Sequence, residues 1–288
     1  MLSRNLSLAI VAASISVLAG CRTMEFLLAN APARFDRITR QVDLPYGPDS
    51  RQRLDVYAPP GAINRLVVIF WYGGSWTEGS KAEYRFVGAT LAEHGFVAVL
   101  PDYRLYPEVT FPAFEEDGAR AVAWVEHHVS ELGGDPKRIV LMGHSAGAHT
   151  AAFLAYNHRF LHRFGADPSC IIGLVGLSGP YLLTPDSPAL RAAFAPPYTE
   201  RDWRPIYFVD SEAPPSLLVH GLDDHDVPAR EAVKLRDTLL EKHVRAELRL
   251  YPHREHGDTV ASFAPIARWR TPAVEDTVEF IRSLSAGR

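Results

Sequence analysis

The chain alternates between short, continuously apolar runs and segments with the composition and spacing of helices. Continuous apolar runs are typical of strands buried on both faces of a parallel sheet. The predicted strands are residues 66–71, 96–100, 139–142, 170–178, 216–219 and 246–251, and the predicted helices are residues 82–94, 114–131, 146–156, 228–242 and 271–284. This alternation predicts an α/β fold with a mostly parallel central sheet flanked by helices. Residues 40–44 and 52–57, around a Tyr-Gly-Pro-Asp turn, predict a hairpin at the start of the sheet.

One apolar run, residues 139–142, breaks into Gly143-His144-Ser145-Ala146-Gly147 and continues as a helix rich in alanine. This strand–turn–helix setting predicts a nucleophile elbow with Ser145 at its tip, because glycines on either side of the serine remove Cβ atoms that would collide in so sharp a turn. The N–H of Ala146, at the start of the helix, is then expected to face a developing oxyanion. Gly-x-Ser-x-Gly alone also fits a plain glycine-rich turn, and the setting favours the elbow.

The strand at residues 66–71 runs directly into Tyr72-Gly73-Gly74-Ser75-Trp76. Two successive glycines after a buried strand let the backbone present N–H groups at close range to a ligand, as an oxyanion hole requires. A Gly-Gly turn without function is the alternative. The predicted nucleophile elbow follows one strand–helix–strand–helix unit later, and this order favours an oxyanion hole at the two glycines.

Composition narrows the classes of partner and cofactor. A length of 288 residues with 47% apolar content favours one large core, and a net charge of −4 without clustered Lys and Arg argues against nucleic acid as a partner. The histidine pairs His158/His162 and His253/His256 lack the further ligands of a zinc site, so neither a metal nor a cofactor is expected.

The N-terminus has the organisation of a secretory signal: a positive start at Arg4, then an uncharged apolar run at residues 6–18 that is too short to span a bilayer comfortably. It ends in Leu18-Ala19-Gly20-Cys21, which resembles the lipobox of bacterial lipoproteins. This resemblance implies a signal peptide at residues 1–20, followed by a lipidated Cys21. Residues 21–40 would then form the lipidated cysteine and a tether able to dock as a helix. The lipid would hold the protein on a membrane surface of the bacterial cell envelope, and Arg22 favours the outer membrane. An ordinary signal peptide with a coincidental cysteine is the alternative. With Cys21 lipidated, only Cys170 remains and no intrachain disulfide is expected.

Several motifs occur together in the order of a known family: Tyr72-Gly73-Gly74-Ser75-Trp76, Gly79-Ser80-Lys81, residues 102–108, Phe111-Pro112-Ala113, Glu116-Asp117 and Gly143-His144-Ser145-Ala146-Gly147. In these the chain resembles the α/β-hydrolase esterases, most closely the hormone-sensitive-lipase-like and feruloyl/acetyl-esterase-like carboxylesterases. The resemblance implies the α/β-hydrolase fold over residues 41–288, with a small cap segment at about 179–215. It also implies an oxyanion hole built from the N–H groups of Gly74, Ser75 and Ala146, and a structural clamp at residues 102–108. Tyr72 stands where the family usually has histidine, so the anchoring of this loop must differ.

The remaining members of the site follow two late strands. Asp224 lies in the loop after residues 216–219 and matches the family pattern His-Gly-x-x-Asp-x-x-Val-Pro, and His256 follows residues 246–251 and matches the catalytic histidine. Asp223 and Asp226 are the neighbouring carboxylates. Asp226 is expected to cap the helix that begins near Pro228.

These residues together predict a serine carboxylesterase that hydrolyses small carboxylic esters through Ser145, His256 and Asp224. The same site could hydrolyse an amide, as the resembling arylformamidases do. A non-catalytic binding lipoprotein on a hydrolase scaffold is the alternative from another class, and the complete set of site residues argues against it.

Overall fold

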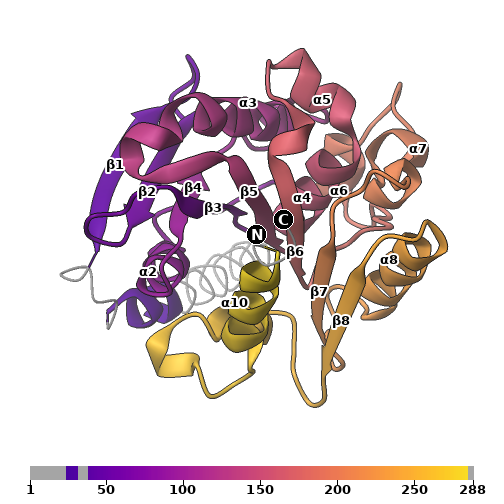
Figure 1. Ribbon diagram of the computed structural model, residues 1–288. Helices are drawn as coiled ribbons and strands as arrows, with labels where there is room; N and C mark the ends of the chain where they lie inside the picture. Colours follow the sequence, from indigo (N-terminus) through magenta and orange to yellow (C-terminus); the bar gives the residue numbers. More distant parts are fainter. Residues whose placement is uncertain (1–23, 32–37, 285–288) are drawn as a thin grey trace, which may run out of the picture.

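The computed structural model describes residues 24–31 and 38–284, and within them eight strands form one sheet in the order β1-β2-β4-β3-β5-β6-β7-β8 (Figure 1). The strands are β1 (Thr39–Pro45), β2 (Arg53–Ala58), β3 (Arg65–Trp71), β4 (Val97–Pro101), β5 (Gly134–His144), β6 (Ile171–Leu177), β7 (Ser216–Gly221) and β8 (Ala246–Tyr251). All pairs among β3 to β8 are parallel, and β1 and β2 form the predicted antiparallel hairpin. The predicted fold class is therefore confirmed.

Helices cover both faces of this sheet, with α2 and α10 on one side and α3, α4 and α5 on the other (Figure 1). Their bounds are α2 (Arg85–Glu93), α3 (Ala113–His128), α4 (Ala146–Tyr156), α5 (His158–Arg163), α6 (Pro188–Ala193), α7 (Glu200–Trp203), α8 (Arg230–Glu241), α9 (Asp258–Ala261) and α10 (Ala273–Ser283). The predicted helix at 114–131 stops earlier than expected. Its last turn is a separate 3-10 turn, Val129–Leu132, which Gly133 ends with a φ of 84°.

Burial explains why the strands and helix at the centre carry almost no polar residues. Every residue of β6 is buried, and so is every residue of α4, the helix that follows Ser145. A helix enclosed on all sides needs small and apolar side chains all round, which accounts for its alanine-rich sequence. The elbow joins α4 to β5, whose last six residues are buried and which pairs with β6, so it has little freedom to move.

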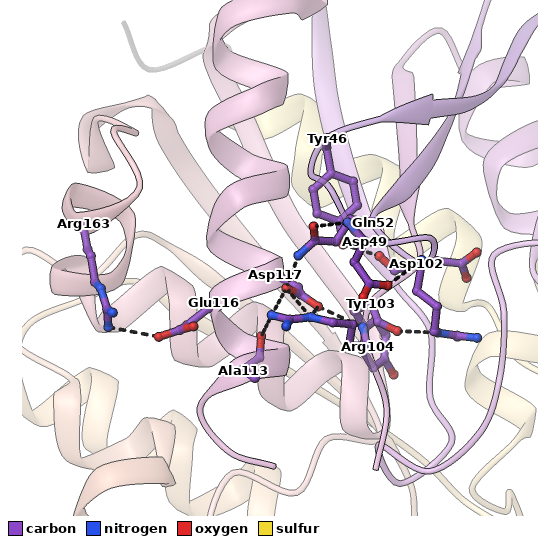
Figure 2. Close-up of polar contacts among 11 residues, drawn as sticks. Tyr46, Asp49, Gln52, Asp102, Tyr103, Arg104, Ala113, Glu116, Asp117 and Arg163 are labelled. Atoms are coloured by element: carbon purple, nitrogen blue, oxygen red, sulfur yellow. Dashed lines mark hydrogen bonds and ion pairs between the residues drawn. The ribbon is translucent and has the colours of Figure 1, made fainter. Parts of the chain in front are cut away.

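The loop after β4 is clamped to α3, as expected for residues 102–108 (Figure 2). The fully buried carboxylate of Asp117 accepts hydrogen bonds from the side chain of Arg104, with Nη2 at 2.7 Å, and from Gln52 Nε2 at 2.7 Å. The backbone N–H of Arg104 also donates to Asp117. A buried carboxylate is stable only when it is paired and hydrogen-bonded, and this one joins the hairpin, the β4 loop and α3.

Residues 179–215, predicted to form a cap segment, contain α6 and α7 and pack on the rest of the structure through aromatic rings. Phe194 is buried and lies 4.9 Å from Trp76 and 5.7 Å from Phe111 between ring centroids, while buried Trp203 lies 5.4 Å from Phe194. Tyr198 is partly exposed. Of the cap aromatics, Phe194 and Trp203 therefore serve packing, and Phe194 supports the loop that contains Ser75.

The predicted signal peptide, Cys21 and part of the tether lie outside the described residues. Residues 24–30 form a short helix, which lies within the range 21–40 where the sequence indicated a tether able to dock as a helix. No helix in the described ranges combines the length and the apolarity needed to cross a bilayer.

Candidate active site

Ser145 occupies the turn between β5 and α4 with a φ of 54° and a ψ of −124°. This backbone conformation is costly for a residue with a side chain, and it persists only where the surroundings impose it. The N–H of Ser145 donates to the carbonyl of Leu177 at 2.9 Å, which ties the turn to the neighbouring strand. The side chain stays partly open to solvent.

The glycines around Ser145 are required by close packing. A Cβ at Gly143 would lie 2.2 Å from the carbonyl carbon of Gly147, and a Cβ at Gly147 would lie 2.1 Å from the carbonyl oxygen of Trp71. A Cβ at Gly73 would lie 2.8 Å from the Cβ of Ser145. The loop after β3 therefore runs directly against the serine.

Asp224 and His256 are joined by a hydrogen bond of 2.8 Å between Asp224 Oδ2 and His256 Nδ1. The carboxylate is fully buried, whereas the imidazole of His256 keeps 16% of its side-chain area exposed. Since a carboxylate only accepts, Nδ1 carries the proton and Nε2 is left as the basic nitrogen. The two loops after β7 and β8 thus produce an oriented imidazole with its basic atom directed away from the carboxylate.

A second imidazole, which was not predicted from the sequence, contacts the same carboxylate oxygen. His220, the next-to-last residue of β7, is fully buried, and its Nε2 lies 3.1 Å from Asp224 Oδ2 and 2.8 Å from the carbonyl oxygen of Val227. Both neighbours are acceptors, so Nε2 carries the proton and donates. The signal in the sequence was the histidine that opens the His-Gly-x-x-Asp pattern.

The other oxygen of Asp224 holds the loop itself. Asp224 Oδ1 accepts the backbone N–H groups of Asp226 at 3.0 Å and Val227 at 2.8 Å. Burial opposes ionisation of this carboxyl group, but the hydrogen bonds from His220 and His256 outweigh it, and the pKa of Asp224 lies well below its usual range. Asp224 is therefore ionised at neutral pH and fully hydrogen-bonded.

The expectation that Asp226 caps the following helix is wrong. Helix α8 begins at Arg230 after Ala229, and no side chain caps its first turn. Asp224 takes the loop N–H groups instead, because its carboxylate points inward while Asp226 is exposed. Asp223 also faces away from the pair and lies 3.5 Å from His253, whose side chain is 92% exposed.

His144, the residue before the serine, connects the elbow to the histidine loop. Its Nε2 donates to the carbonyl oxygen of His256 at 3.1 Å, and the two rings lie 4.9 Å apart. Burial lowers the pKa of His144 to about 3, so this imidazole is neutral at physiological pH. Ser145 and His256 are thereby held in neighbouring positions, although no hydrogen bond joins their side chains in this structure.

The loop after β3 presents several N–H groups beside the serine. Gly74, Ser75 and Trp76 have positive φ values of 129°, 52° and 57° in succession, and the carbonyl of Gly74 accepts the N–H groups of Thr77 and Glu78. Neither Gly74 nor Ser75 donates its own N–H within the described part of the chain. Ala146 opens α4, where the first N–H groups have no intrahelical acceptor. The assignment of these three donors to an oxyanion hole stays a prediction.

Tyr72, at the position where the resembling esterases are expected to have histidine, anchors this loop. Its hydroxyl accepts a hydrogen bond from Arg51 Nη2 at 2.9 Å, and its carbonyl accepts one from the Tyr103 hydroxyl at 2.9 Å. The rings of Tyr72 and Tyr103 stack with centroids 4.7 Å apart. The expected difference in anchoring is thus present, and it consists of an arginine and a tyrosine stack.

One group of potential metal ligands lies at this site. Within the described ranges, the carboxylates of Asp224 and Asp226 and the imidazole of His256 bring ligand atoms within 4.8 Å of one another. Both oxygens of Asp224 already accept hydrogen bonds, so these atoms are engaged with each other and with the loop.

The chain is similar to two family models and to several known proteins. The model of the prolyl oligopeptidase family matches residues 119–274, more than half of the chain, and the BD-FAE model matches residues 54–168. The chain is 32% identical to the isoprenylcysteine alpha-carbonyl methylesterase of Arabidopsis thaliana over 74% of this chain and 55% of that protein. It is also 32% identical to the probable carboxylic ester hydrolase LipM of Mycobacterium tuberculosis over 72% of this chain and 54% of that protein. The chain thus spans about half the length of the curated relatives it matches.

Solved structures share the fold. An inhibited esterase B from Lactobacillus rhamnosis superposes with a TM-score of 0.77 at 20% identity over 97% of this chain and 96% of that chain. A truncated carbohydrate esterase from gut microbiota superposes with a TM-score of 0.76 at 23% identity over 88% of this chain and 99% of that chain. At these identities the likeness concerns the architecture.

Proposed function

Since the chain belongs to the α/β-hydrolase esterase family, we propose that it is a serine carboxylesterase that hydrolyses small carboxylic esters through an acyl-enzyme. Ser145 is the nucleophile, His256 the general base and Asp224 the acid that orients the imidazole. The observation that carries this proposal is the strained Ser145 turn beside a histidine whose Nδ1 is held by a buried carboxylate. The ester hydrolases among the relatives support the reaction class.

In the first half of the reaction, His256 Nε2 takes the proton of the Ser145 hydroxyl as its oxygen attacks the ester carbonyl. Asp224, ionised because its pKa lies well below its usual range, keeps the proton on Nδ1 and stabilises the imidazolium that forms. The imidazolium then gives its proton to the leaving alcohol. Water enters, is deprotonated by the same nitrogen, and releases the acid from Ser145.

The tetrahedral intermediate carries a negative oxygen that needs preorganised donors. We assign this role to the N–H groups of Gly74, Ser75 and Ala146. Support comes from the free N–H groups of the loop, from its contact with Ser145 through Gly73, and from the position of Ala146 at a helix N-terminus. Because these donors are backbone atoms, serine at position 75 can serve as well as glycine.

The test compares the parent chain with Ser145→Ala. The variant should fold with an unchanged melting temperature and lose ester turnover by about 10³-fold or more, and a serine-directed organophosphonate should label only Ser145 in the parent. Full activity in the variant, or labelling at another residue, would contradict the assignment. Nitrophenyl esters of increasing chain length, acetylated sugars and N-formyl arylamines define the substrate; preferential cleavage of the formamides would replace the ester assignment with an amide hydrolase.

The proposal includes a location. We infer that Cys21 carries lipid and holds the enzyme on a membrane surface of the bacterial cell envelope, most consistently the outer membrane. The support is the apolar run at residues 6–18 that ends in Leu18-Ala19-Gly20-Cys21. Mass spectrometry of the mature N-terminus should find an acylated Cys21, and Cys21→Ser should lose that modification. An unmodified N-terminus at another residue would contradict the anchor.

A further inference from the structure

Five large apolar side chains that the mechanism does not use gather on two segments, residues 24–30 and 266–269. They are exposed by 50 to 72%, and we name them the apolar patch: Met24 (57%), Leu27 (61%), Leu28 (50%), Ile266 (57%) and Trp269 (72%). Surface side chains of this size scattered singly are ordinary, whereas a contiguous group marks a contact surface.

The helix at residues 24–30 is fixed to the domain by one face. Asn30 donates to the carbonyl of Glu83 at 2.8 Å and accepts the N–H of Phe86 at 3.0 Å, so its side chain binds the start of α2 in both directions. The ring of Phe26 packs on Tyr84 with centroids 5.1 Å apart. The helix therefore has a defined orientation on the domain.

This orientation directs the other face outward. Met24, Leu27 and Leu28 follow the spacing i, i+3 and i+4, which places them on one side of a helix, and all three are exposed. A helix on the surface of a soluble domain normally has polar residues on its outer face. An outer face of methionine and two leucines is suited to an apolar medium.

A groove of about 460 Å³ separates this helix from the second segment of the apolar patch. Leu28 lines it on the helix side and Trp269 lines it on the opposite side, so the two segments share one surface. The groove also reaches His144, whose ring contacts that of His256. The apolar patch thus lies beside the histidine loop of the candidate active site.

The exposed indole of Trp269 is flanked by basic side chains. The guanidinium carbons of Arg254 and Arg270 lie 5.9 and 5.5 Å from the centre of its ring, and Arg270 also pairs with Asp258. Tryptophan is favoured where one end of a side chain meets lipid and the other meets water, and guanidinium groups bind phosphate. The rim of the apolar patch is therefore suited to the phosphate level of a bilayer.

We propose that the apolar patch docks on the surface of a lipid bilayer and holds the active site over it, so that the preferred substrates are esters carried by the bilayer. This proposal rests on the esterase function proposed above. The position of the helix favours lipid as the occupant, because Met24 lies three residues after Cys21, the proposed lipid anchor. An anchor so close holds the exposed leucines at the membrane surface, and the arginine rim complements anionic headgroups.

Docking can be read from the fluorescence of Trp269. The full chain is reconstituted with vesicles of equal parts phosphatidylcholine and phosphatidylglycerol, with and without bromine on the acyl chains. Bromine should quench part of the tryptophan emission of the parent. Trp269→Phe should remove that quenching, because Trp71, Trp76 and Trp203 are buried and the partly buried Trp124 lies on α3, on the other face of the sheet. If bromine does not quench the tryptophan emission of the parent, the proposal is overturned. A dimer formed through the apolar patch would give this result. Quenching that persists in Trp269→Phe also overturns the proposal.

A kinetic experiment separates docking from catalysis. The double variant Leu27→Glu with Leu28→Glu should hydrolyse an ester embedded in the same vesicles about 10-fold more slowly or worse, since two apolar side chains no longer enter lipid. Its rate on a water-soluble acetate ester should equal that of the parent. Leu240→Glu, which changes a leucine 49% exposed on α8, is the matched control and should match the parent on both esters. Equal vesicle rates in the double variant and the parent refute docking, whereas a parent inactive on the soluble ester refutes the esterase itself.

Discussion

His256 Nδ1 and His220 Nε2 lie 2.8 Å and 3.1 Å from one and the same oxygen of Asp224, and His220 shares its N–H between this oxygen and the carbonyl of Val227. Two donors on one oxygen stabilise the charged form of the carboxylate more than one donor can, and they restrict its rotation. His220 has no route to a substrate of its own because its side chain is fully buried. We therefore regard it as a positioning residue that acts through Asp224.

Removal of this donor should be measurable in the pH profile. In His220→Leu, kcat should fall by about 10-fold to 100-fold, because the carboxylate that orients His256 is no longer held in one position. The carboxylate becomes more basic without its second donor and supports the imidazolium more strongly, so the acid limb of kcat/KM should move to higher pH. His220→Gln, which keeps an N–H near the same place, should recover most of the activity. An unshifted acid limb in His220→Leu would show that the residue only fills space.

The neighbouring carboxylates of this loop should separate by function. Asp224→Asn places an amide donor against the N–H of His256, so the imidazole loses its required tautomer and kcat should fall by about 10³-fold to 10⁴-fold. Asp226→Asn changes an exposed side chain that caps no helix, and both its kcat and its melting temperature should stay close to those of the parent. Both variants are compared on one activated ester. An inactive Asp226→Asn beside an active Asp224→Asn would reverse the assignment of the acid.

Two glycine substitutions test whether the elbow depends on close packing. Gly147→Ala would place a Cβ 2.1 Å from the backbone oxygen of Trp71, which cannot move without disturbing β3, so the free energy of unfolding should fall by about 2 kcal/mol or more. Gly257→Ala is the control, because a Cβ there meets nothing within 4 Å and the residue has an ordinary φ of −75°. Its cost should stay within about 0.5 kcal/mol. Similar losses in the two variants, measured by urea unfolding, would mean that alanine is tolerated at the elbow.

The fold, and the pairing of Asp224 with His256, were predictable because local pattern and fold agree along most of this chain. The elbow depends on glycine at fixed positions around Ser145, and that requirement can be read in the sequence as directly as in the structure. The contacts of His220 and His144 depend instead on how separate loops pack. His144 donates to the carbonyl of His256, which is distant along the chain, and His220 contacts Asp224, because the loop after β7 folds back onto this strand. The cap on α8 was predicted wrongly for a related reason. Sequence spacing placed a carboxylate near the helix start but did not show that Asp224 would take the loop N–H groups.

The buried imidazole of His144 should make stability depend on pH below neutrality. Burial lowers its folded-state pKa to about 3, whereas in the unfolded chain it titrates near the ordinary value of about 6.5. Between these values the unfolded state binds one more proton than the folded state, so this group destabilises the fold progressively as pH falls from about 6.5, by about 1.4 kcal/mol per pH unit. In His144→Gln, which has no titrating ring but keeps an N–H for the His256 carbonyl, the loss of stability between about pH 7 and pH 5 should therefore be smaller by about 2 kcal/mol. Urea unfolding at several pH values measures this difference, with His253→Gln, a change to an exposed ring, as the matched control. Parallel pH curves for His144→Gln and the parent would mean that His144 is protonated within the folded protein, and the neutral donor assigned to the elbow would have to be abandoned.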